Sequence, residues 1–405
     1  MANPKLRFSK QYPDWKFYQI KDIVEVNPYT AELPERFVYI DLESVDRGNL
    51  TATNIIDRRD APSRAQRLIE KDDVLFQLVR PYQQNNLIYS GLCHLPAVAS
   101  TGYAQLRPTK TVTCPSFLYT AVHTKTFLEN VLCRCTGGAY PAINTSDLSE
   151  ISLSMPCLEE QQKIAEFFTA LDEKIRIQLN TVDKLNAIKT GMLAKVFSYE
   201  NTLDWTVRKF DEIFALNRTF PVSRDQMSDE CDQTSDNSKI IHYGDILTIY
   251  GHIVNPKYDS IGYLVTDVNA KDDDYLCDGD IVFADAAEDY TVGKAIELYG
   301  VDCKLLSGLH TIAARPKVTF ASGYLSYFFN SPLFKSQVRT LATGTKVMSL
   351  TKSSIQTTSI SFPSIEEQEK ISNLLNTLDN KIAISKKKLE ALKQLKKAFM
   401  QRMFV

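Results

Sequence analysis

Two stretches in the first half of the chain gather side chains suited to base-specific hydrogen bonding. The first holds four arginines within ten residues: Arg58, Arg59, Arg64 and Arg67. The second runs Arg80-Pro81-Tyr82-Gln83-Gln84-Asn85-Asn86 and concentrates amide side chains beside a tyrosine. Arginine suits guanine, asparagine and glutamine suit adenine, and other basic groups hold phosphates. Both stretches are candidate DNA contacts, and each could equally be a solvated loop.

The corresponding part of the second half has different chemistry. Residues 285–294 are acidic, and their candidate contacts are Tyr290 and Lys294. Two Thr-Gly loops add Tyr140 in the first half and Thr345 and Lys346 in the second, with Lys352 beyond. Glycine permits close backbone approach, but a tight turn required by the fold is the preferred explanation for these loops. The two halves therefore differ in side-chain chemistry at equivalent places.

Sequence motifs of catalysis are absent. The string Asn27-Pro28-Tyr29-Thr30 lacks the second proline of an adenine methyltransferase element, and Gly293-Lys294-Ala295 lacks the rest of a phosphate-binding P-loop. Neither HExxH nor GxSxG occurs, the five histidines are dispersed, and the eight cysteines form no CxxC pair. We therefore expect no catalytic residue, no metal site and no cofactor bound by this chain.

Composition indicates a folded protein of two or three domains. The chain has 405 residues, 47 basic against 49 acidic side chains, and a formal net charge of −2. Its start is polar and it has no run of 18 apolar residues, so neither secretion nor membrane spanning is expected. Scattered cysteines favour a reduced, cytoplasmic setting. The near-neutral charge by itself gives no hint of nucleic acid.

An internal repeat is the strongest signal in the sequence. Residues 156–197 and 363–404 align without a gap, and both begin P-x-x-E-E-Q-x-K-I and continue to L-D-x-K-I. Thr136-Gly137 matches Thr343-Gly344 at the same offset, and Asp73–Phe76 matches Asp280–Phe283. The chain is therefore a duplicated unit, a globular part followed by a long helix. The acidic, Ser-rich residues 228–238 are the expected insertion in the second copy, as an exposed loop.

Apolar residues in both repeated segments recur with a period near 3.5, which is typical of a coiled coil. The pattern breaks at Gln178 and Lys189 and at the equivalent Ser385 and Lys396. Docking of each helix on its own domain is the alternative, but two matched helices favour antiparallel pairing with each other. The predicted seam consists of Ile164, Phe168, Leu171, Ile175, Val182, Leu185, Met192 and Val196 with Ile371, Leu375, Leu378, Ile382, Leu389, Leu392, Phe399 and Met403.

The globular parts mix short strands with helices, which predicts an α+β fold. Expected strands are 37–40, 74–76 and 281–283, and expected helices are 115–132 and 324–341.

The duplicated segment resembles the conserved regions of specificity (S) subunits of type I restriction-modification systems. Similar surroundings are Leu6-Arg7-Phe8 before Asp14-Trp15, the run 241–246, the run 308–311 and Thr343-Gly344-Thr345-Lys346. The resemblance covers essentially the whole chain, and the repeated helix is its specific part. It implies two target recognition domains, 1–155 and 199–362, and two spacer helices, 156–198 and 363–405.

The resemblance also implies what the chain works with. Each recognition domain would read one half of a bipartite site in double-stranded DNA, and the helices would set the spacer. Two methyltransferase (M) subunits and, in the full complex, restriction (R) subunits would be the partners, and these would carry S-adenosylmethionine, ATP and Mg²⁺. A duplicated scaffold without DNA specificity is the alternative. Because residues 203–362 have an acidic excess, we expect weak DNA binding by this chain alone.

Overall fold

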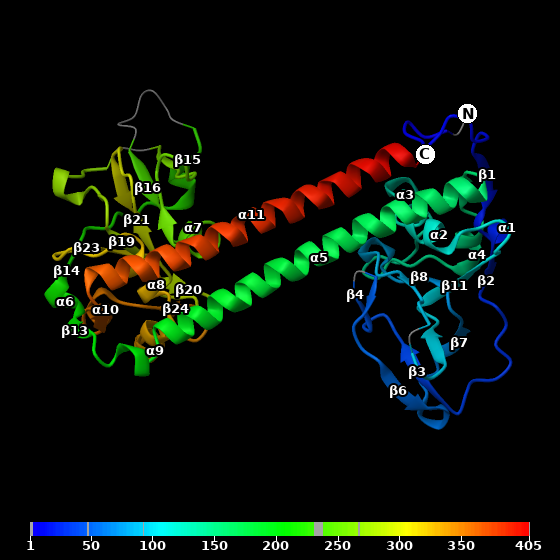
Figure 1. Cartoon of the computed structure of the whole chain (residues 1–405), viewed down its shortest axis with the longest axis horizontal. Helices are drawn as coiled ribbons and strands as arrows, with labels where there is room; N and C mark the ends of the chain where they lie inside the picture. Colours follow the sequence, from blue (N-terminus) through cyan, green and yellow to red (C-terminus); the bar gives the residue numbers. More distant parts are fainter. Residues whose placement is uncertain (1–2, 47, 92, 231–237, 266–267, 405) are drawn as a thin grey trace. The chain divides into compact units, whose positions relative to one another are not determined.

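The computed structural model describes residues 3–46, 48–91, 93–230, 238–265 and 268–404 (Figure 1). The chain forms two compact units, Met1–Asn180 with Lys387–Val405 and Thr181–Lys386. Each unit contains one globular domain, part of the first long helix and part of the second. We call the globular parts domain 1 and domain 2.

Domain 1 is built on two mixed or antiparallel four-stranded sheets. One has the order β6 (Asn54–Asp57), β3 (Arg36–Ile40), β10 (Ala97–Ser100), β7 (Ala65–Ile69), with β3 and β10 parallel. The other has the order β2 (Val24–Val26), β11 (Tyr103–Pro108), β8 (Val74–Gln77), β9 (Leu87–Ile88) and is antiparallel. Short pairs join β1 (Lys16–Gln19) to β12 (Ser152–Met155) and β4 (Val45–Asp46) to β5 (Asn49–Leu50). The predicted strands at 37–40 and 74–76 are confirmed.

The helices of domain 1 are short: α1 (Ile20–Ile23), α2 (Pro115–Ala121), α3 (Lys125–Leu132) and α4 (Thr145–Ser149), with 3₁₀ turns η1 (Arg58–Asp60) and η2 (Pro81–Gln83). The single helix predicted over 115–132 is thus two helices. Thr124 begins the second one, because its hydroxyl accepts a hydrogen bond from the Phe127 amide. A threonine in this role starts a helix and so separates it from the preceding one.

Domain 2 repeats this plan with a larger sheet. The sheet has the order β14 (Phe214–Leu216), β23 (Thr311–Pro316), β19 (Ile281–Ala284), β21 (Ala295–Leu298), β17 (Ile253–Val254). A second sheet has the order β15 (Met227–Ser228), β18 (Tyr263–Leu264), β16 (Lys239–Ile241), β22 (Leu305–Ser307). Two short pairs join β13 (Thr206–Lys209) to β25 (Ser359–Phe362) and β20 (Ala286–Ala287) to β24 (Met348–Ser349). The predicted strand 281–283 lies within β19.

The helices of domain 2 are α6 (Phe210–Ile213), α7 (Tyr243–Thr248), α8 (Tyr324–Phe329), α9 (Pro332–Leu341) and α10 (Lys352–Gln356), with 3₁₀ turns at Glu200–Thr202, Arg224–Gln226 and Asp272–Asp274. The predicted helix 324–341 is again two helices, since Ser331 caps α9 and Pro332 occupies its first position. Most of the predicted insertion, 231–237, lies outside the described residues. Both domains are α+β, as expected.

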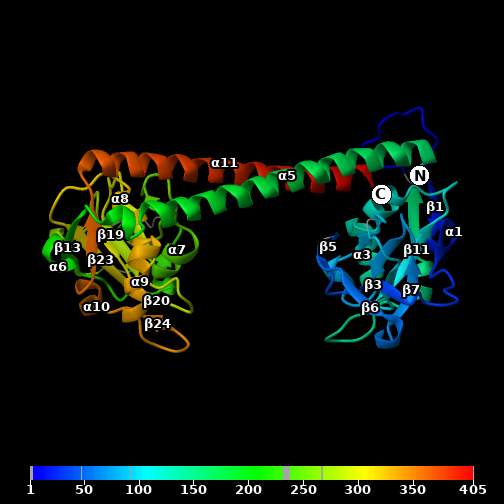
Figure 2. The same cartoon turned by 60° about the horizontal axis from the view of Figure 1, so that its bottom comes forward.

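The two long helices are α5 (Leu158–Val196) and α11 (Ile365–Met403), within the ranges predicted for them. Inside unit 1 they run antiparallel, because Phe167 contacts Phe399 and the later residue Asp172 pairs with the earlier residue Lys396. Figure 2 shows the end of α11 beside α5 near the chain's N-terminus. Inside unit 2 the pair Lys189 and Asp379 joins the other halves of the same helices.

All predicted seam residues are buried or half-buried. The outer ones also belong to the domain cores: Ile164, Phe168 and Met403 lie in the core of domain 1, and Ile371 and Leu375 lie in that of domain 2. Helix pairing and docking on the domains, the two alternatives, therefore occur together. The ends of the helices are anchored in the globular parts, and this fixes each domain on the helical segments of its own unit.

Candidate nucleic-acid interface

Domain 1 brings two of the candidate stretches together. The loop 136–142 is closed by reciprocal backbone hydrogen bonds between Thr136 and Ala142, both 2.9 Å. Val79 forms a β-bridge with Ala142, and the Arg80 amide donates to the Pro141 carbonyl at 2.7 Å. The segment that starts at Arg80 therefore lies against the Thr-Gly loop, and the two form one surface element.

Domain 2 has the same backbone frame. Thr343 and Ser349 exchange hydrogen bonds of 3.0 and 2.8 Å, and β20 pairs Ala286 with Ser349 and Ala287 with Met348. Each residue of this frame lies 207 positions after its counterpart in domain 1, so Ala287 corresponds to Arg80 and Val347 to Tyr140. Domain 1 and domain 2 thus have equivalent loops with different side chains.

Glycine is required in both loops. Gly137 has a φ of 92°, and a Cβ there would lie 2.9 Å from the Tyr140 carbonyl oxygen. Gly344 has a φ of 118°, and its Cβ would lie 2.0 Å from the Val347 oxygen. Both positions combine a left-handed backbone with a close approach that only glycine tolerates. The Thr-Gly pair therefore builds the turn, and the residues that follow it project from the domain.

The exposed side chains of the domain 1 element are aromatic and basic. Tyr82 is 50% exposed and Tyr140 is 65% exposed. The guanidinium of Arg80 stacks on the Tyr140 ring at 4.2 Å from its centroid. Two rings and one guanidinium at the rim of a loop are groups that stack on bases or hydrogen-bond their edges.

The amides of the second stretch have mainly internal roles. Asn86 is 1% exposed, and its Oδ1 accepts from the Gln77 amide at 2.8 Å. Gln83 Oε1 accepts from the Gln77 side chain at 2.9 Å. The backbone amide of Asn85 donates to Gln77 Oε1 at 3.0 Å. Gln84, half-buried, points its amide to the His123 carbonyl at 3.5 Å. Burial and these hydrogen bonds keep Asn86 inside the domain, whereas a DNA contact would need its side chain at the surface.

The four arginines of the first stretch lie on η1, on β7 and between them. Arg58 pairs with Glu32 at 2.5 Å, and Arg59 pairs with Asp60 at 3.4 Å. Arg64 is exposed, whereas Arg67 is half-buried and its Nε has no hydrogen-bond partner among the described residues. Burial lowers the pKa of Arg67. These arginines stay candidates, with Arg58 and Arg59 already neutralised by neighbouring carboxylates.

Some candidate residues of domain 2 are exposed, and others contact neighbouring groups of the domain. Thr345 and Lys346 are exposed on the loop, and Tyr290 is 64% exposed with Arg339 over its ring at 5.7 Å. Lys352 is exposed and donates to the Asn217 carbonyl at 3.3 Å. Arg339, on α9, had no signal in the sequence, because nothing local links it to Tyr290.

The side chain of Lys294 contacts the end of helix α7. Its Nζ donates to the carbonyls of Leu247 and Tyr250, at 3.2 and 3.3 Å, where helix α7 ends. Lys294 is half-buried, and this desolvation lowers its pKa. The ammonium satisfies carbonyls that the end of a helix leaves without partners, so it has a structural role in this domain.

The repeated P-x-x-E-E-Q segment ties each long helix to its domain. Gln161 Oε1 accepts from the Cys114 amide at 2.9 Å, and its Nε2 donates to the Val112 and Pro156 carbonyls at 3.0 Å. Gln368 does the same in domain 2, accepting from the Ala321 amide and donating to the Pro363 carbonyl. The strongest motif of the sequence is therefore a structural clamp.

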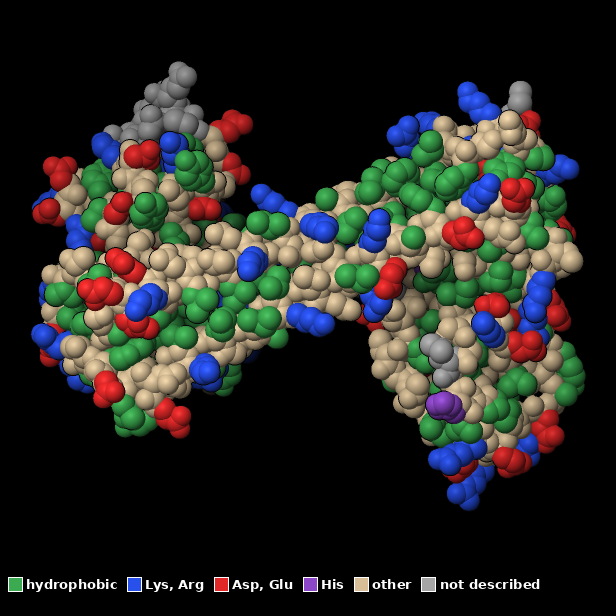
Figure 3. Space-filling model, viewed as in Figure 1, with side chains coloured by type: hydrophobic (Ala, Val, Ile, Leu, Met, Phe, Trp, Pro, Cys, Tyr) green, Lys and Arg blue, Asp and Glu red, His purple; other side chains and the backbone are tan. Residues whose placement is uncertain are grey.

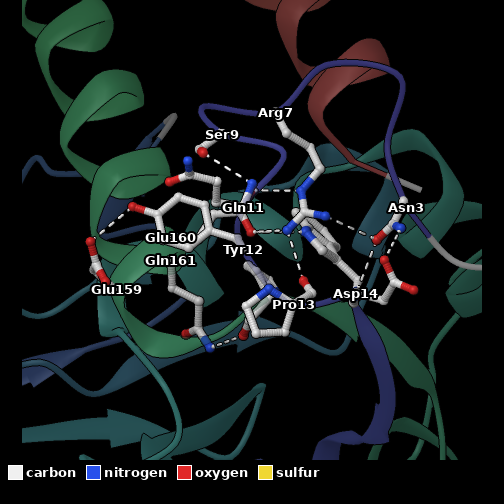
Figure 4. A network of polar contacts seen from close by, with 12 residues as sticks. Asn3, Arg7, Ser9, Gln11, Tyr12, Pro13, Asp14, Glu159, Glu160 and Gln161 are labelled. Atoms are coloured by element: carbon white, nitrogen blue, oxygen red, sulfur yellow. Dashed lines mark hydrogen bonds and ion pairs between the residues drawn. The ribbon is translucent and has the colours of Figure 1, made fainter.

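A polar network at the start of α5 adds to this clamp in unit 1 (Figure 4). Arg7 reaches the buried Glu160 with two hydrogen bonds, of 3.0 and 2.7 Å, and the Trp15 indole donates to the same carboxylate at 3.3 Å. Hydrogen bonding to Glu160 raises the pKa of Arg7. The N-terminal segment is thus fixed on the helix, and the Leu6 amide also donates to the Arg402 carbonyl at 2.8 Å.

The surface charge is mixed. Figure 3 shows acidic and basic side chains interspersed over both domains on the face that it draws. Among the described residues, no group of three or more His, Cys, Asp or Glu side chains could hold a metal ion. No helix of the described part is long and apolar enough to cross a membrane.

Comparison with known proteins assigns the chain to a family. The model of the type I restriction modification DNA specificity domain matches residues 12–190 and 203–394. The specificity subunit of the type I restriction enzyme HindI of Haemophilus influenzae is 26% identical over 194 residues, which are 45% of this chain and 41% of that protein. The putative MjaX specificity subunit of Methanocaldococcus jannaschii is 24% identical over 96% of this chain and 92% of the relative.

The MjaVIII specificity subunit of the same archaeon is matched over 64% of its length, so the chain spans less than two thirds of two of these relatives. Among solved structures, a type I restriction-modification system S subunit from M. genitalium aligns over 100% of this chain and 99% of its own, with a TM-score of 0.60 and 14% identity. A chain of a type I system studied for its assembly aligns over 98% and 99%, with a TM-score of 0.61 and 20% identity. These structures have the same fold. Because the family model covers both halves, this chain belongs to the family of type I restriction modification DNA specificity domains and carries the domain twice.

Proposed function

We propose that the chain is the sequence-recognition subunit of a type I restriction-modification complex, in which each domain reads one half of a bipartite DNA site. The observation that carries this proposal is the pair of equivalent loops. One backbone frame carries Arg80 and Tyr140 in domain 1 and Ala287 and Val347 in domain 2. A shared frame with unlike side chains suits two half-sites of different sequence.

The helices have a separate role in the proposal. They set the spacing between the half-sites and offer the surface on which two methyltransferase subunits and, in the full complex, restriction subunits assemble. The chain itself is noncatalytic and cytoplasmic and binds no cofactor. S-adenosylmethionine, ATP and Mg²⁺ belong to the partner subunits, which also supply much of the charge that neutralises DNA phosphates.

Methylation mapping tests this function. The chain is expressed with its methyltransferase subunit in a host without adenine methylation, and methyladenine is mapped across the genome. We expect a split motif with methyladenine in both halves, which vanishes when the gene is deleted. Methylation that persists unchanged without the chain would contradict the proposal and favour a scaffold without DNA specificity.

An exchange of domain 1 gives the sharper control. Replacing residues 1–155 by those of another family member should change one half of the motif and leave the other half and the spacer intact. A change in both halves would show that the domains do not read independently.

A further inference from the structure

Arg80 occupies a backbone position that is costly for any side chain. Its φ is 53°, in the left-handed region, and its amide is fixed to the Pro141 carbonyl at 2.7 Å. The Arg80 carbonyl accepts from the Gln83 amide at 3.0 Å, so both ends of the residue are held. Non-glycine residues in this conformation cost free energy and concentrate where the geometry serves a function. The side chain is thus presented in one direction by a constrained backbone.

Among the residues that the structure describes, none accepts a hydrogen bond from the Arg80 guanidinium. Its central carbon lies over the Tyr140 ring, 4.2 Å from the centroid, and its Nε is buried without an acceptor among the described residues. No carboxylate of the described residues forms an ion pair with the Arg80 guanidinium. An arginine without acceptors in its own domain favours a ligand that brings them to its guanidinium.

A flat guanidinium edge matches one base best. Guanine presents O6 and N7 in the major groove, and arginine donates to both at once. A phosphate can also accept two hydrogen bonds from one guanidinium. The two ligands differ in their effect on the motif, because a phosphate contact carries no base preference.

Domain 2 provides an internal comparison. At the corresponding backbone positions it has Ala287, which is buried, and Val347, which is 52% exposed. Neither side chain can donate a hydrogen bond, although β20 and β24 hold the two segments together as the bridge does in domain 1. The difference between the two loops at this point is therefore in side-chain chemistry.

We propose that Arg80, oriented by Tyr140, is a specificity-determining residue that reads a guanine in the half-site recognised by domain 1. The inference rests on the proposed function, and it adds the base and the residue pair. Tyr140 acts as a positioning residue, because it holds the guanidinium plane.

The test maps methyladenine for complexes that carry Arg80→Ala, Arg80→Lys, Tyr140→Ala or Tyr140→Phe. Arg80→Ala should relax one guanine in the domain 1 half-site, with a loss of discrimination of roughly 5- to 150-fold, and leave the other half-site unchanged. Arg80→Lys keeps the charge but loses the planar donor pair, so it should weaken discrimination at the same position, though less than Arg80→Ala. Tyr140→Phe should retain the motif, and Tyr140→Ala should weaken discrimination at that position only.

Arg36→Ala is the matched control, because Arg36 is an exposed arginine on β3 of the same domain whose contact with Asp57 is 4.0 Å. It should leave the motif intact. Uniform loss of methylation by folded Arg80 variants, or an unchanged motif, would overturn the inference and assign Arg80 to phosphate or to structure. If Arg80→Ala does not fold, Arg80→Lys decides the question. Failure of the proposed function is distinct, since the wild-type complex would then direct no split motif.

Discussion

Lys396 on α11 forms an ion pair of 2.5 Å with Asp172 on α5, and the equivalent residues of the repeat, Lys189 and Asp379, form the same pair in unit 2. Each pair joins an aspartate from one helix to a lysine from the other. Lys189 and Lys396 are two of the four residues at which the apolar seam breaks. These two breaks are therefore matched polar contacts between antiparallel helices.

These pairs predict a charge-exchange result. Asp172→Lys should destabilise unit 1, because Lys396 would then face a like charge in a half-buried setting. We expect a loss of about 1 kcal/mol, since exposed ion pairs contribute up to about that amount. The double variant Asp172→Lys with Lys396→Asp should recover most of it. Urea denaturation checks both, and a double variant as unstable as the single one would contradict the pairing.

The sequence predicts structural features that depend on a local residue pattern. It does not predict contacts between residues that are far apart in the chain. The repeat, both long helices and the α+β class follow from periodicity. The roles of Asn86 and Lys294 do not, because Gln77 and the end of α7 decide them through contacts made only after folding. Arg80 and Tyr140 were separate candidates, and the β-bridge at Ala142 is what makes them one site. The hydrogen bonds of Gln161 could not be predicted for the same reason. The repetition of this glutamine at Gln368 indicated only that the position matters.

The Thr-Gly loop offers neighbouring glycines with opposite expectations. Gly137→Ala would place a Cβ 2.9 Å from the Tyr140 carbonyl oxygen at a φ of 92°. Domain 1 should lose about 1–3 kcal/mol of stability as the loop shifts. A Cβ on Gly138 would have nothing within 4 Å, so Gly138→Ala should leave the free energy of unfolding unchanged. Equal thermal shifts of the two variants would contradict the loop geometry.

The Gln161 clamp predicts a difference between two glutamines on the same helix. Gln161 is 1% exposed and makes three hydrogen bonds to backbone groups of its unit. Gln161→Ala leaves the Cys114 amide and the Val112 carbonyl without this partner, which should cost about 1–3 kcal/mol. Its neighbour Gln162 is exposed, and Gln162→Ala should have little effect on stability. Calorimetry of both variants measures the difference, and equal melting temperatures would show that the clamp adds no stability.

Glu297, on β21, predicts a pH dependence of stability in domain 2. Its carboxylate is 3% exposed and accepts from the Gly323 amide at 2.6 Å and the Ser326 amide at 3.3 Å. Burial raises the pKa of Glu297 from the ordinary glutamate value of 4.5 to about 7. Between these two values the folded protein holds a proton that the unfolded chain releases. Stability is therefore complete below the unfolded pKa and falls as pH rises through the folded one.

The expected loss across this window is on the order of 3 kcal/mol, which urea denaturation at a series of pH values would measure. Glu297→Gln should remove the slope, because the amide stays neutral and still offers an oxygen to the Gly323 amide. Glu200→Gln is the control, since Glu200 is exposed on its 3₁₀ turn and the variant should keep the wild-type slope. A Glu297→Gln profile that follows the wild type would mean that another group titrates, and His252, whose pKa burial lowers to about 4, would give a slope of opposite sign. The direction of the slope thus separates the two groups.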